Sequence, residues 1–243
     1  MSRRSRYEYG YGYGYNYGSR KQVDPAEQLE KLRKKDPNIN PVIISGKLAS
    51  SWWAQAWNKN LESYADYANR LGRGRSYVKK GAVLNLSIAP GKVEALVQGS
   101  QTKPYKITVD IDPLSKKKWD AVTERCSHKI DGLEELASGK FPQEFMEMFT
   151  DRSIGLFPSP KEIHFSCTCP DWASMCKHVA ATLYGIGARF DEDPTLFFRL
   201  RDIDFTELLK KSVDEKMESM LKNAGKVTPR VIEDADTFEL FGV

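Results

Sequence analysis

One short segment restricts the fold of this chain more than any other feature. Residues 166–178 contain three of the four cysteines and one of the three histidines in the 243-residue chain. These residues, Cys167, Cys169, Cys176 and His178, follow the spacing C-x-C-x6-C-x-H. If the four side chains act together, the two ends of the segment must lie side by side, and the neighbouring elements must pack accordingly.

The sequence around these residues predicts a strand, a turn and a helix. From Ile163 to Cys169, hydrophobic or cysteine side chains alternate with polar ones, so Cys167 and Cys169 share one face of a strand. A turn follows, and hydrophobic residues then recur at helical spacing. The turn residues are Pro170, Asp171 and Ser174, and the helical residues are Val179, Leu183, Ile186 and Phe190. Folding the helix onto the strand brings Cys176 and His178 to the two thiols of the strand.

This set of side chains predicts a structural zinc site. Three thiolates and one imidazole are ligands that tetrahedral zinc takes in closed structural sites. We therefore predict zinc as the cofactor, bound by Cys167, Cys169, Cys176 and His178. Because the protein fills all four positions, no water can be activated and no zinc catalysis is expected.

Alternatives to zinc remain open for the cysteines. A disulfide suits an oxidising compartment, which does not fit a histidine-containing cluster in a chain expected to lack a signal peptide. A redox pair would use the lowered pKa of a thiol at a helix N-terminus, although the usual C-x-x-C spacing is absent. An iron–sulfur cluster normally takes four cysteines, and the last alternative is ordinary buried thiols. Cys126 and His128 form a second C-x-H, but two ligands do not make a site, so we expect Cys126 to be a buried thiol.

The C-x-C-x6-C-x-H spacing on a strand–turn–helix resembles the SWIM zinc finger. From about residue 45 to residue 243, the chain is similar to the prokaryotic SWIM zinc finger family proteins. The other segments that carry the resemblance are Trp52-Trp53-x-x-x-Trp57 and Val97-Gln98-Gly99-Ser100 before Pro104-Tyr105. The resemblance implies a module that interacts with DNA or with proteins. Because relatives are commonly encoded near Swi/Snf-type helicase ATPases, it also implies such an ATPase as a partner.

Composition and charge are those of a protein with a hydrophobic core. Hydrophobic residues make up 40% of the chain and charged residues 29%. No apolar run approaches the roughly 20 residues of a membrane span, so we expect a cytoplasmic protein without a membrane segment. The formal net charge of +4 is concentrated in residues 1–22, which hold five basic residues and one acidic residue and leave 32 of each sign in residues 23–243.

Residues 1–23 predict a disordered tail rich in arginine, tyrosine and glycine. Six tyrosines mostly alternate with glycine, which weakens a strand. Arginine and tyrosine together are suited to hold phosphates and to stack on bases. The alternative is a terminus that only keeps the protein in solution.

A second basic stretch lies between Asp66 and Glu94, where no acidic residue occurs. Gly72 and Gly74 are interspersed with the cations, which predicts a backbone able to approach a phosphate closely. The predicted nucleic-acid contacts are Arg70, Arg73, Arg75, Lys79 and Lys80. The alternative is that this run of charge only solvates a loop.

The remaining periodicities predict an α+β fold. Alternating stretches at 82–88, 93–97 and 105–111 predict an antiparallel meander, with a turn at Pro90-Gly91. Helices are expected at 24–35, at 53–71 with a cap at Ser50 or Ser51 and a stop at Gly72, and at 115–125, 131–138, 142–151, 194–200 and 205–221. Trp53 and Trp57 are expected to anchor the core, and Phe197, Phe198, Leu208 and Leu209 to cover the finger or meet a partner.

The predicted domains are the tail (1–23), an N-terminal domain of helices and meander (24–150), the strand–turn–helix finger (151–200), and a C-terminal helix with an acidic and apolar tail (201–243).

No arrangement of residues predicts an enzyme. We find no Ser/His/Asp set, no placed pair of carboxylates and no phosphate-binding loop, and three histidines leave little for general-base catalysis. The sequence therefore favours a non-enzymatic zinc protein that binds DNA or RNA, a protein partner, or both, and the resemblance to the SWIM family implies a Swi/Snf-type ATPase as that partner. The alternatives are a pure protein–protein adaptor and a thiol redox protein.

Overall fold

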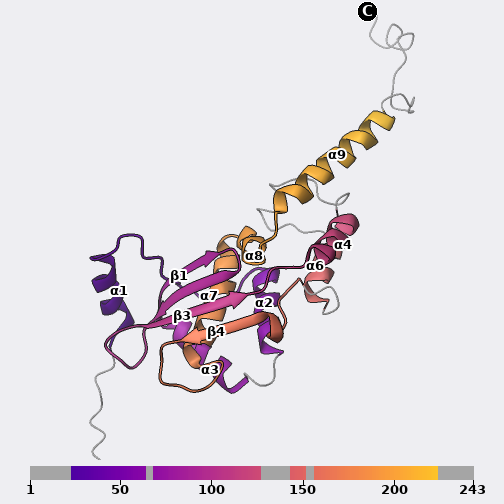
Figure 1. Cartoon of the computed structure of the whole chain (residues 1–243). Coiled ribbons are helices and arrows are strands. Elements are labelled where there is room, and N and C mark those ends of the chain that lie inside the picture. Colours follow the sequence, from indigo (N-terminus) through magenta and orange to yellow (C-terminus); the bar gives the residue numbers. More distant parts are fainter. Residues whose placement is uncertain (1–22, 64–67, 127–142, 152–155, 224–243) are drawn as a thin grey trace, which may run out of the picture.

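The predicted α+β class is confirmed: a four-stranded antiparallel sheet carries helices on one face (Figure 1). A computed structural model describes residues 23–63, 68–126, 143–151 and 156–223. The strands are β1 (Val83–Ala89), β2 (Lys92–Val97), β3 (Tyr105–Ile111) and β4 (Ile163–Cys167). The helices are α1 (Pro25–Arg33), α2 (Trp52–Glu62), α3 (Ala68–Lys79), α4 (Lys116–Cys126), α6 (Gln143–Thr150), α7 (Lys177–Glu192), α8 (Thr195–Leu200) and α9 (Phe205–Asn223), and a 3-10 turn spans Pro160–Glu162.

The predicted meander forms the first three strands of the sheet. Ala89 pairs with Lys92 across the turn at Pro90-Gly91, where Gly91 has a φ of 66°, which favours glycine. The fourth strand, β4, comes from the cysteine-containing segment and pairs with β3. The sequence pattern did not predict this pairing, which makes the candidate metal-binding segment part of the same sheet.

Helix α7 lies at the centre of the molecule, between the sheet and helices α2 and α3. Every residue from His178 to Phe190 is buried. On the sheet side, a Cβ added to Gly185 would lie 2.9 Å from a Leu86 methyl group. On the helix side, a Cβ added to Gly187 would lie 2.7 Å from the Asn58 side chain. A helix covered on all sides accounts for its apolar sequence.

The tryptophan helix α2 docks onto α7, which confirms the predicted anchoring role of Trp57. The Trp57 indole N–H donates to the Leu183 carbonyl at 2.9 Å, and the Trp53 indole N–H donates to the Phe190 carbonyl at 2.7 Å. Ser51 caps the helix, as predicted. However, α2 ends at Glu62 and does not continue to Leu71.

The basic stretch is a helix and not a glycine-containing loop, so the prediction that Gly72 stops a helix is wrong. Both Gly72 and Gly74 lie inside α3. A Cβ added to Gly74 would lie 2.5 Å from the Ala180 Cβ and 2.8 Å from the Ala180 carbonyl carbon. Gly74 therefore allows α3 to cross α7 closely, whereas the sequence suggested close approach to a phosphate.

At the other end of α7, aromatic residues form a cluster. The Phe197 ring lies 4.7 Å from the Phe149 ring and 5.4 Å from the Phe157 ring, between centroids, and both Phe197 and Phe198 are buried. The Phe197 ring also lies 5.9 Å from the Phe190 ring, between centroids, so Phe197 covers the helix of the predicted finger, at the end of α7 opposite the cysteines. Because both Phe197 and Phe198 are buried, neither offers a surface to a partner. The side chains of Leu208 and Leu209 lie outside the described residues.

Several predictions fall outside the described residues. These are the tail at 1–22, the helix at 131–138, His128, the Cys126 side chain and the acidic and apolar C-terminal end. The domain boundaries also stay predictions. Among the described residues, no helix is long and apolar enough to cross a membrane.

Candidate metal centre

The four predicted zinc ligands lie together at the N-terminal end of α7. One ligand atom from each of Cys167, Cys169, Cys176 and His178 can be chosen so that all lie within 4.8 Å of one another. Cys167 is the last residue of β4, and Cys176 is the N-cap of α7. Cys169 lies in the bend after β4, so the prediction that the strand continues to Cys169 is wrong by two residues. The cluster can hold a metal ion.

The spacing of Cys176 and His178 is that of two ligands of one metal ion. The Sγ of Cys176 lies 3.7 Å from the Nδ1 of His178. Metal–sulfur bonds of about 2.3 Å and metal–nitrogen bonds of about 2.05 Å at a tetrahedral angle place the two ligand atoms about 3.6 Å apart. All three of these cysteines are free thiols. The geometry thus fits metal ligands and not a disulfide.

The sheet fixes the first half of the site. Ile107 of β3 stands opposite Cys167 of β4. One residue further on, the Thr168 N–H donates to the Lys106 carbonyl at 3.1 Å, and the Lys106 N–H donates to the Thr168 hydroxyl at 3.0 Å. This pairing holds the chain between Cys167 and Cys169 in place before it turns toward α7.

Burial differs among the ligands and shapes their acidity. Cys176 and His178 are buried, whereas Cys167 and Cys169 are half-buried. Hydrogen bonding between Cys167 and Cys176 lowers the pKa of the Cys176 thiol and raises that of Cys167. Burial raises the pKa of Cys169. The lowered pKa of Cys176 suits a ligand at a helix N-terminus, where the helix dipole favours negative charge.

The His178 ring is held between two tyrosines and a glycine. Its centroid lies 4.5 Å from that of Tyr105 and 5.4 Å from that of Tyr77. A Cβ added to Gly99 would lie 2.3 Å from the Tyr105 ring and 2.8 Å from the His178 Nε2. Glycine is therefore required here for close approach, which gives a physical reason for Gly99 in the Val97–Ser100 segment.

The orientation of His178 selects its ligand atom. Nδ1 faces Cys176, while Nε2 is buried and has no hydrogen-bond partner among the described residues. Coordination through Nδ1 places the proton on Nε2.

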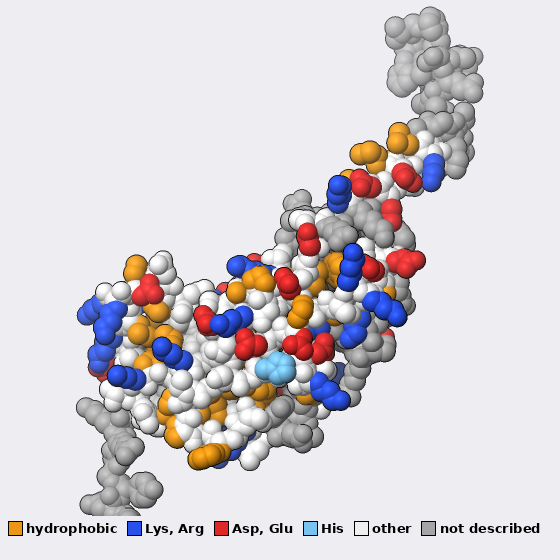
Figure 2. Space-filling view, in the orientation of Figure 1, with side chains coloured by type: hydrophobic (Ala, Val, Ile, Leu, Met, Phe, Trp, Pro, Cys, Tyr) orange, Lys and Arg blue, Asp and Glu red, His pale blue; other side chains and the backbone are white. Residues whose placement is uncertain are grey.

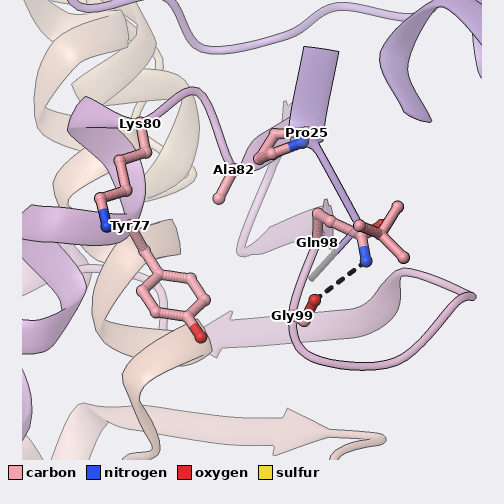
Figure 3. Close-up of a pocket in the computed structure, with 7 residues that line it drawn as sticks. Pro25, Tyr77, Lys80, Ala82, Gln98 and Gly99 are labelled. Atoms are coloured by element: carbon pink, nitrogen blue, oxygen red, sulfur yellow. Dashed lines mark hydrogen bonds between the residues drawn. The ribbon is translucent and has the colours of Figure 1, made fainter. Parts of the chain in front are cut away.

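A pocket of about 100 Å³ is lined in part by Tyr77 and Gly99, two of the residues that hold the His178 ring (Figure 3). Tyr77 and Lys80 line it from the side of α3, and Gln98 and Gly99 line it from the loop after β2. The Gln98 amide donates to the carbonyls of Gly99 at 3.0 Å and Gln101 at 2.6 Å. Its Oε1 is buried and unpartnered among the described residues. The two hydrogen bonds of the Gln98 amide hold the loop that lines one side of the pocket.

The five predicted nucleic-acid contacts do not form one patch. Arg70 pairs with Asp171 at 3.1 Å, with both side chains about 30% exposed. Asp171 lies between β4 and α7, in residues 168–176, which we call the metal-binding loop. Arg75 pairs with Glu62 of α2 at 2.6 Å and donates to the Tyr184 hydroxyl at 2.9 Å. Arg70 and Arg75 thus belong to opposite flanks of α3, one facing the loop and one facing α2.

The other three cations are exposed at the end or on the outer side of α3. In the part of the chain that the structure describes, Arg73, Lys79 and Lys80 form no ion pair. Helical phase puts Arg73 on the flank of Arg70, because the two are one turn apart. Lys80 lies on the same side of α3 as Arg70 and Arg73, since it lines the pocket together with Tyr77. Lys79 lies on the side of Arg75, because the two are four residues apart, about one helical turn.

The sequence analysis missed two residues, Trp172 in the metal-binding loop and Lys177 at the start of α7. Trp172 is fully exposed, at 101% of its reference area. Lys177 places its ammonium 5.5 Å from the centroid of the Tyr77 ring. The available signal was a tryptophan within the Pro170–Ser174 turn, outside the alternating and helical patterns of hydrophobic residues on either side. In Figure 2, hydrophobic side chains gather at the lower edge of the body, where Figure 1 has α3 and this loop, while acidic and basic side chains are mixed over the outer face of the sheet.

Comparison with known proteins gives a relative of uncharacterised function. No protein-family model matches the chain, and no solved structure does. Over 165 residues the chain is 38% identical to the Uncharacterized protein Rv2102 of Mycobacterium tuberculosis (strain ATCC 25618 / H37Rv). The match covers 68% of this chain and 59% of that protein, so the chain spans less than two thirds of its relative's length. The function must therefore be inferred from the site.

Proposed function

We propose that this chain is a non-enzymatic zinc-binding protein whose metal-binding loop and α3 together bind nucleic acid. The observation that carries the zinc assignment is the convergence of three thiols and one imidazole, whose ligand atoms all lie within 4.8 Å of one another, with Nδ1 of His178 3.7 Å from the Cys176 sulfur. Zinc is the metal that this donor set most commonly takes in structural sites. The resemblance of the spacing to the SWIM zinc finger supports the same assignment.

In this proposal the zinc closes the loop between β4 and α7. Apparent binding of structural zinc contributes about 10–16 kcal/mol, which is comparable to the whole stability of a domain, about 5–15 kcal/mol. Because all four positions are filled by the protein, the metal would organise a surface and would not activate water.

Nucleic-acid binding is proposed for the exposed flank of α3 beside the metal-binding loop. The helix contains no acidic residue, and Arg73 and Lys80 lie on this flank. Cations with no acid to pair with are suited to contact phosphates. A Swi/Snf-type helicase ATPase is the proposed protein partner, on the resemblance to the SWIM family alone.

Metal content tests the zinc assignment. We expect native mass spectrometry to find one zinc per chain, and Cys169→Ser to lose it and to melt at a much lower temperature. Cys126→Ala is the matched control, expected to keep the metal. A folded full-length chain without zinc, or equal metal loss in the two variants, would contradict the assignment.

A second candidate function is that of a protein–protein adaptor without nucleic-acid binding. It is favoured by α9, which extends away from the body (Figure 1) and exposes Val213, Met217, Met220 and Leu221 at helical spacing. Affinity capture from native lysate, with and without nuclease, separates the two functions. Nuclease-resistant capture that Met217→Asp abolishes would favour the adaptor, whereas capture lost with nuclease would favour nucleic-acid binding.

A further inference from the structure

We propose that the nucleic acid is single-stranded and that Trp172 stacks on one of its bases. This inference rests on the nucleic-acid binding proposed above and names the form of the ligand. It joins three observations: a fully exposed tryptophan, a loop held by fixed contacts, and a strip of α3 beside that loop.

Trp172 is displayed on an anchored loop. Its side chain is fully exposed, while Met175 and Cys176, a few residues on, are buried. The carboxylate of the preceding residue, Asp171, accepts the Ala173 N–H at 3.2 Å and pairs with Arg70 at 3.1 Å. An indole on a loop held in this way loses little conformational entropy on binding, which favours stacking on a flat partner.

The α3 strip, which we define as Arg70, Arg73, Tyr77 and Lys80, begins beside this loop. Arg70 contacts Asp171 at one end, and Tyr77 contacts the His178 ring and the Lys177 ammonium further along. Lys80 lines the pocket with Tyr77. The spacings of three and four residues put all four side chains on one flank, and ten residues of helix span about 15 Å.

The charges along the strip suit a phosphate backbone. The acidic group facing it from the loop, Asp171, is paired with Arg70, and the acidic group on α2, Glu62, is paired with Arg75 on the opposite flank. Arg73 and Lys80 form no ion pair within the described ranges, and Lys177 adds a third cation next to Tyr77. Phosphates lying along the strip would therefore meet cations with little competition from carboxylates.

Stacking on Trp172 requires an unstacked base. In a duplex the base faces are covered by neighbouring pairs, whereas a single strand can present a base face to an aromatic ring without regard to sequence. The indole of Trp172 would stack on a base, and the cations of the α3 strip would contact the phosphates. The combination favours a single strand of either DNA or RNA over a duplex.

Fluorescence anisotropy on the full chain tests this inference with labelled oligothymidylate, oligouridylate and a mixed-sequence DNA duplex of equal length. Trp172→Ala should weaken binding to both single strands by about 5- to 150-fold, since one base–aromatic stack is worth about 1–3 kcal/mol. The log–log salt slope should stay unchanged, because no charge is lost. Ile43→Ala, an exposed hydrophobic residue outside the loop and strip, is the matched control.

The strip is tested in the same assay by Arg73→Ala combined with Lys80→Ala. Each lost phosphate contact removes about 0.7 from the slope for a single strand, so the slope should flatten by up to about 1.4. Lys117→Ala, on α4, is the charge control and should leave the slope unchanged.

The outcomes separate the two proposals. Weaker binding at constant slope in Trp172→Ala, with zinc content and melting temperature unchanged, supports the inference. Unchanged affinity of Trp172→Ala, together with a flattened slope in the double variant, overturns stacking and leaves nucleic-acid binding intact. A preference for the duplex overturns the inference as well. If the unaltered protein binds none of the three probes, the proposed function itself is wrong and the adaptor is favoured.

Discussion

At the scale of single residues, Arg75 shows how neighbours determine a role that the sequence leaves open. Its charge and position place it with Arg73 in one basic stretch. In the structure its guanidinium pairs with Glu62 and donates to the Tyr184 hydroxyl, which in turn donates to Glu62 at 3.0 Å. Burial raises the pKa of Tyr184 to about 12, so its phenol stays neutral and keeps its proton for Glu62. Arg75 thus links α2, α3 and α7.

We predict that Arg75→Ala lowers stability while Arg73→Ala does not. The lost contacts are charge-assisted but partly exposed, so the cost should be about 1 kcal/mol, or about 2–4 °C in melting temperature for a chain of this size. Differential scanning calorimetry gives the melting temperatures of both variants and of the unaltered protein. An equal melting temperature for Arg75→Ala and the unaltered protein would contradict the structural role of this residue.

A second residue-scale feature is the ion pair between Arg201 and Glu162. Arg201 is fully buried and lies 3.1 Å from Glu162. Burial alone would raise the pKa of the Glu162 carboxyl, but hydrogen bonds from the Ser159 N–H and hydroxyl and from Arg201 outweigh it. The pKa therefore lies below its ordinary value of 4.5. A carboxylate with a depressed pKa stabilises the fold above its unfolded pKa, and this stabilisation is lost as the pH falls through its folded pKa.

We therefore predict that Glu162→Gln is destabilising at pH 7 by up to about 3 kcal/mol, because it removes a carboxylate that pairs with a buried guanidinium. The difference from the unaltered protein should shrink as the pH falls below about 4.5. Comparing the two at each pH cancels the loss of metal that acid causes in both. Glu94→Gln, an exposed carboxylate, is the control, and a Glu162→Gln penalty that grows in acid would contradict the assignment.

At the scale of elements, the crossing of α3 over α7 depends on one of two neighbouring glycines. A Cβ added to Gly74 would meet the Ala180 Cβ at 2.5 Å, whereas one added to Gly72 meets nothing within 4 Å. The two glycines share a helix but have opposite requirements. Gly74 is needed for packing, and Gly72 only lowers helix propensity.

The same substitution at these two positions should have opposite effects. Gly74→Ala should cost about 1–3 kcal/mol through overpacking. Gly72→Ala should stabilise by up to about 1 kcal/mol, since alanine favours a helix interior. Chemical denaturation of the two variants and of the unaltered protein gives the change in unfolding free energy for each substitution. Similar effects at the two sites would mean that α3 does not cross α7 at Gly74.

Local patterns predicted the elements well and their packing poorly. The ligand spacing, the alternation in β1 to β3 and the Ser51 cap are properties of neighbouring residues, so they can be read from the sequence. The pairing of β3 with β4 joins residues such as Ile107 and Cys167, far apart in the chain, and no local period encodes it. Gly74 was misinterpreted for the same reason, because a helix tolerates a glycine when another helix must approach.

At the scale of the whole molecule, α7 connects the metal centre to every layer. It begins at the ligands Cys176 and His178, and it packs on α2, α3 and the sheet. Its far end reaches the aromatic cluster around Phe197. Unfolding of the first turn of α7 should therefore weaken the packing of α2, α3 and the sheet.

We predict that chelation lowers the melting temperature of the whole body in a single transition. Binding of metal to the folded state alone adds stability that disappears when the metal is removed. Near-ultraviolet circular dichroism of the buried Trp57 and far-ultraviolet measurements should change together. The control is the chelator already saturated with zinc. Loss of structure confined to the metal-binding loop, with Trp57 unaffected, would contradict this coupling.

The pairing of β4 with β3 makes the protein suited to use as a split biosensor. A cut between α4 and α6 would put β1 to β3 with α2 and α3 in one fragment, and β4, the ligands and α7 in the other. Neither fragment alone could complete the sheet or cover α7. With the proposed zinc, the second fragment would adopt the loop that follows β4, and β4 would then pair with Ile107–Ile111 of β3. Reassembly of two tagged fragments would then report free zinc, a use that independently folding zinc fingers do not offer.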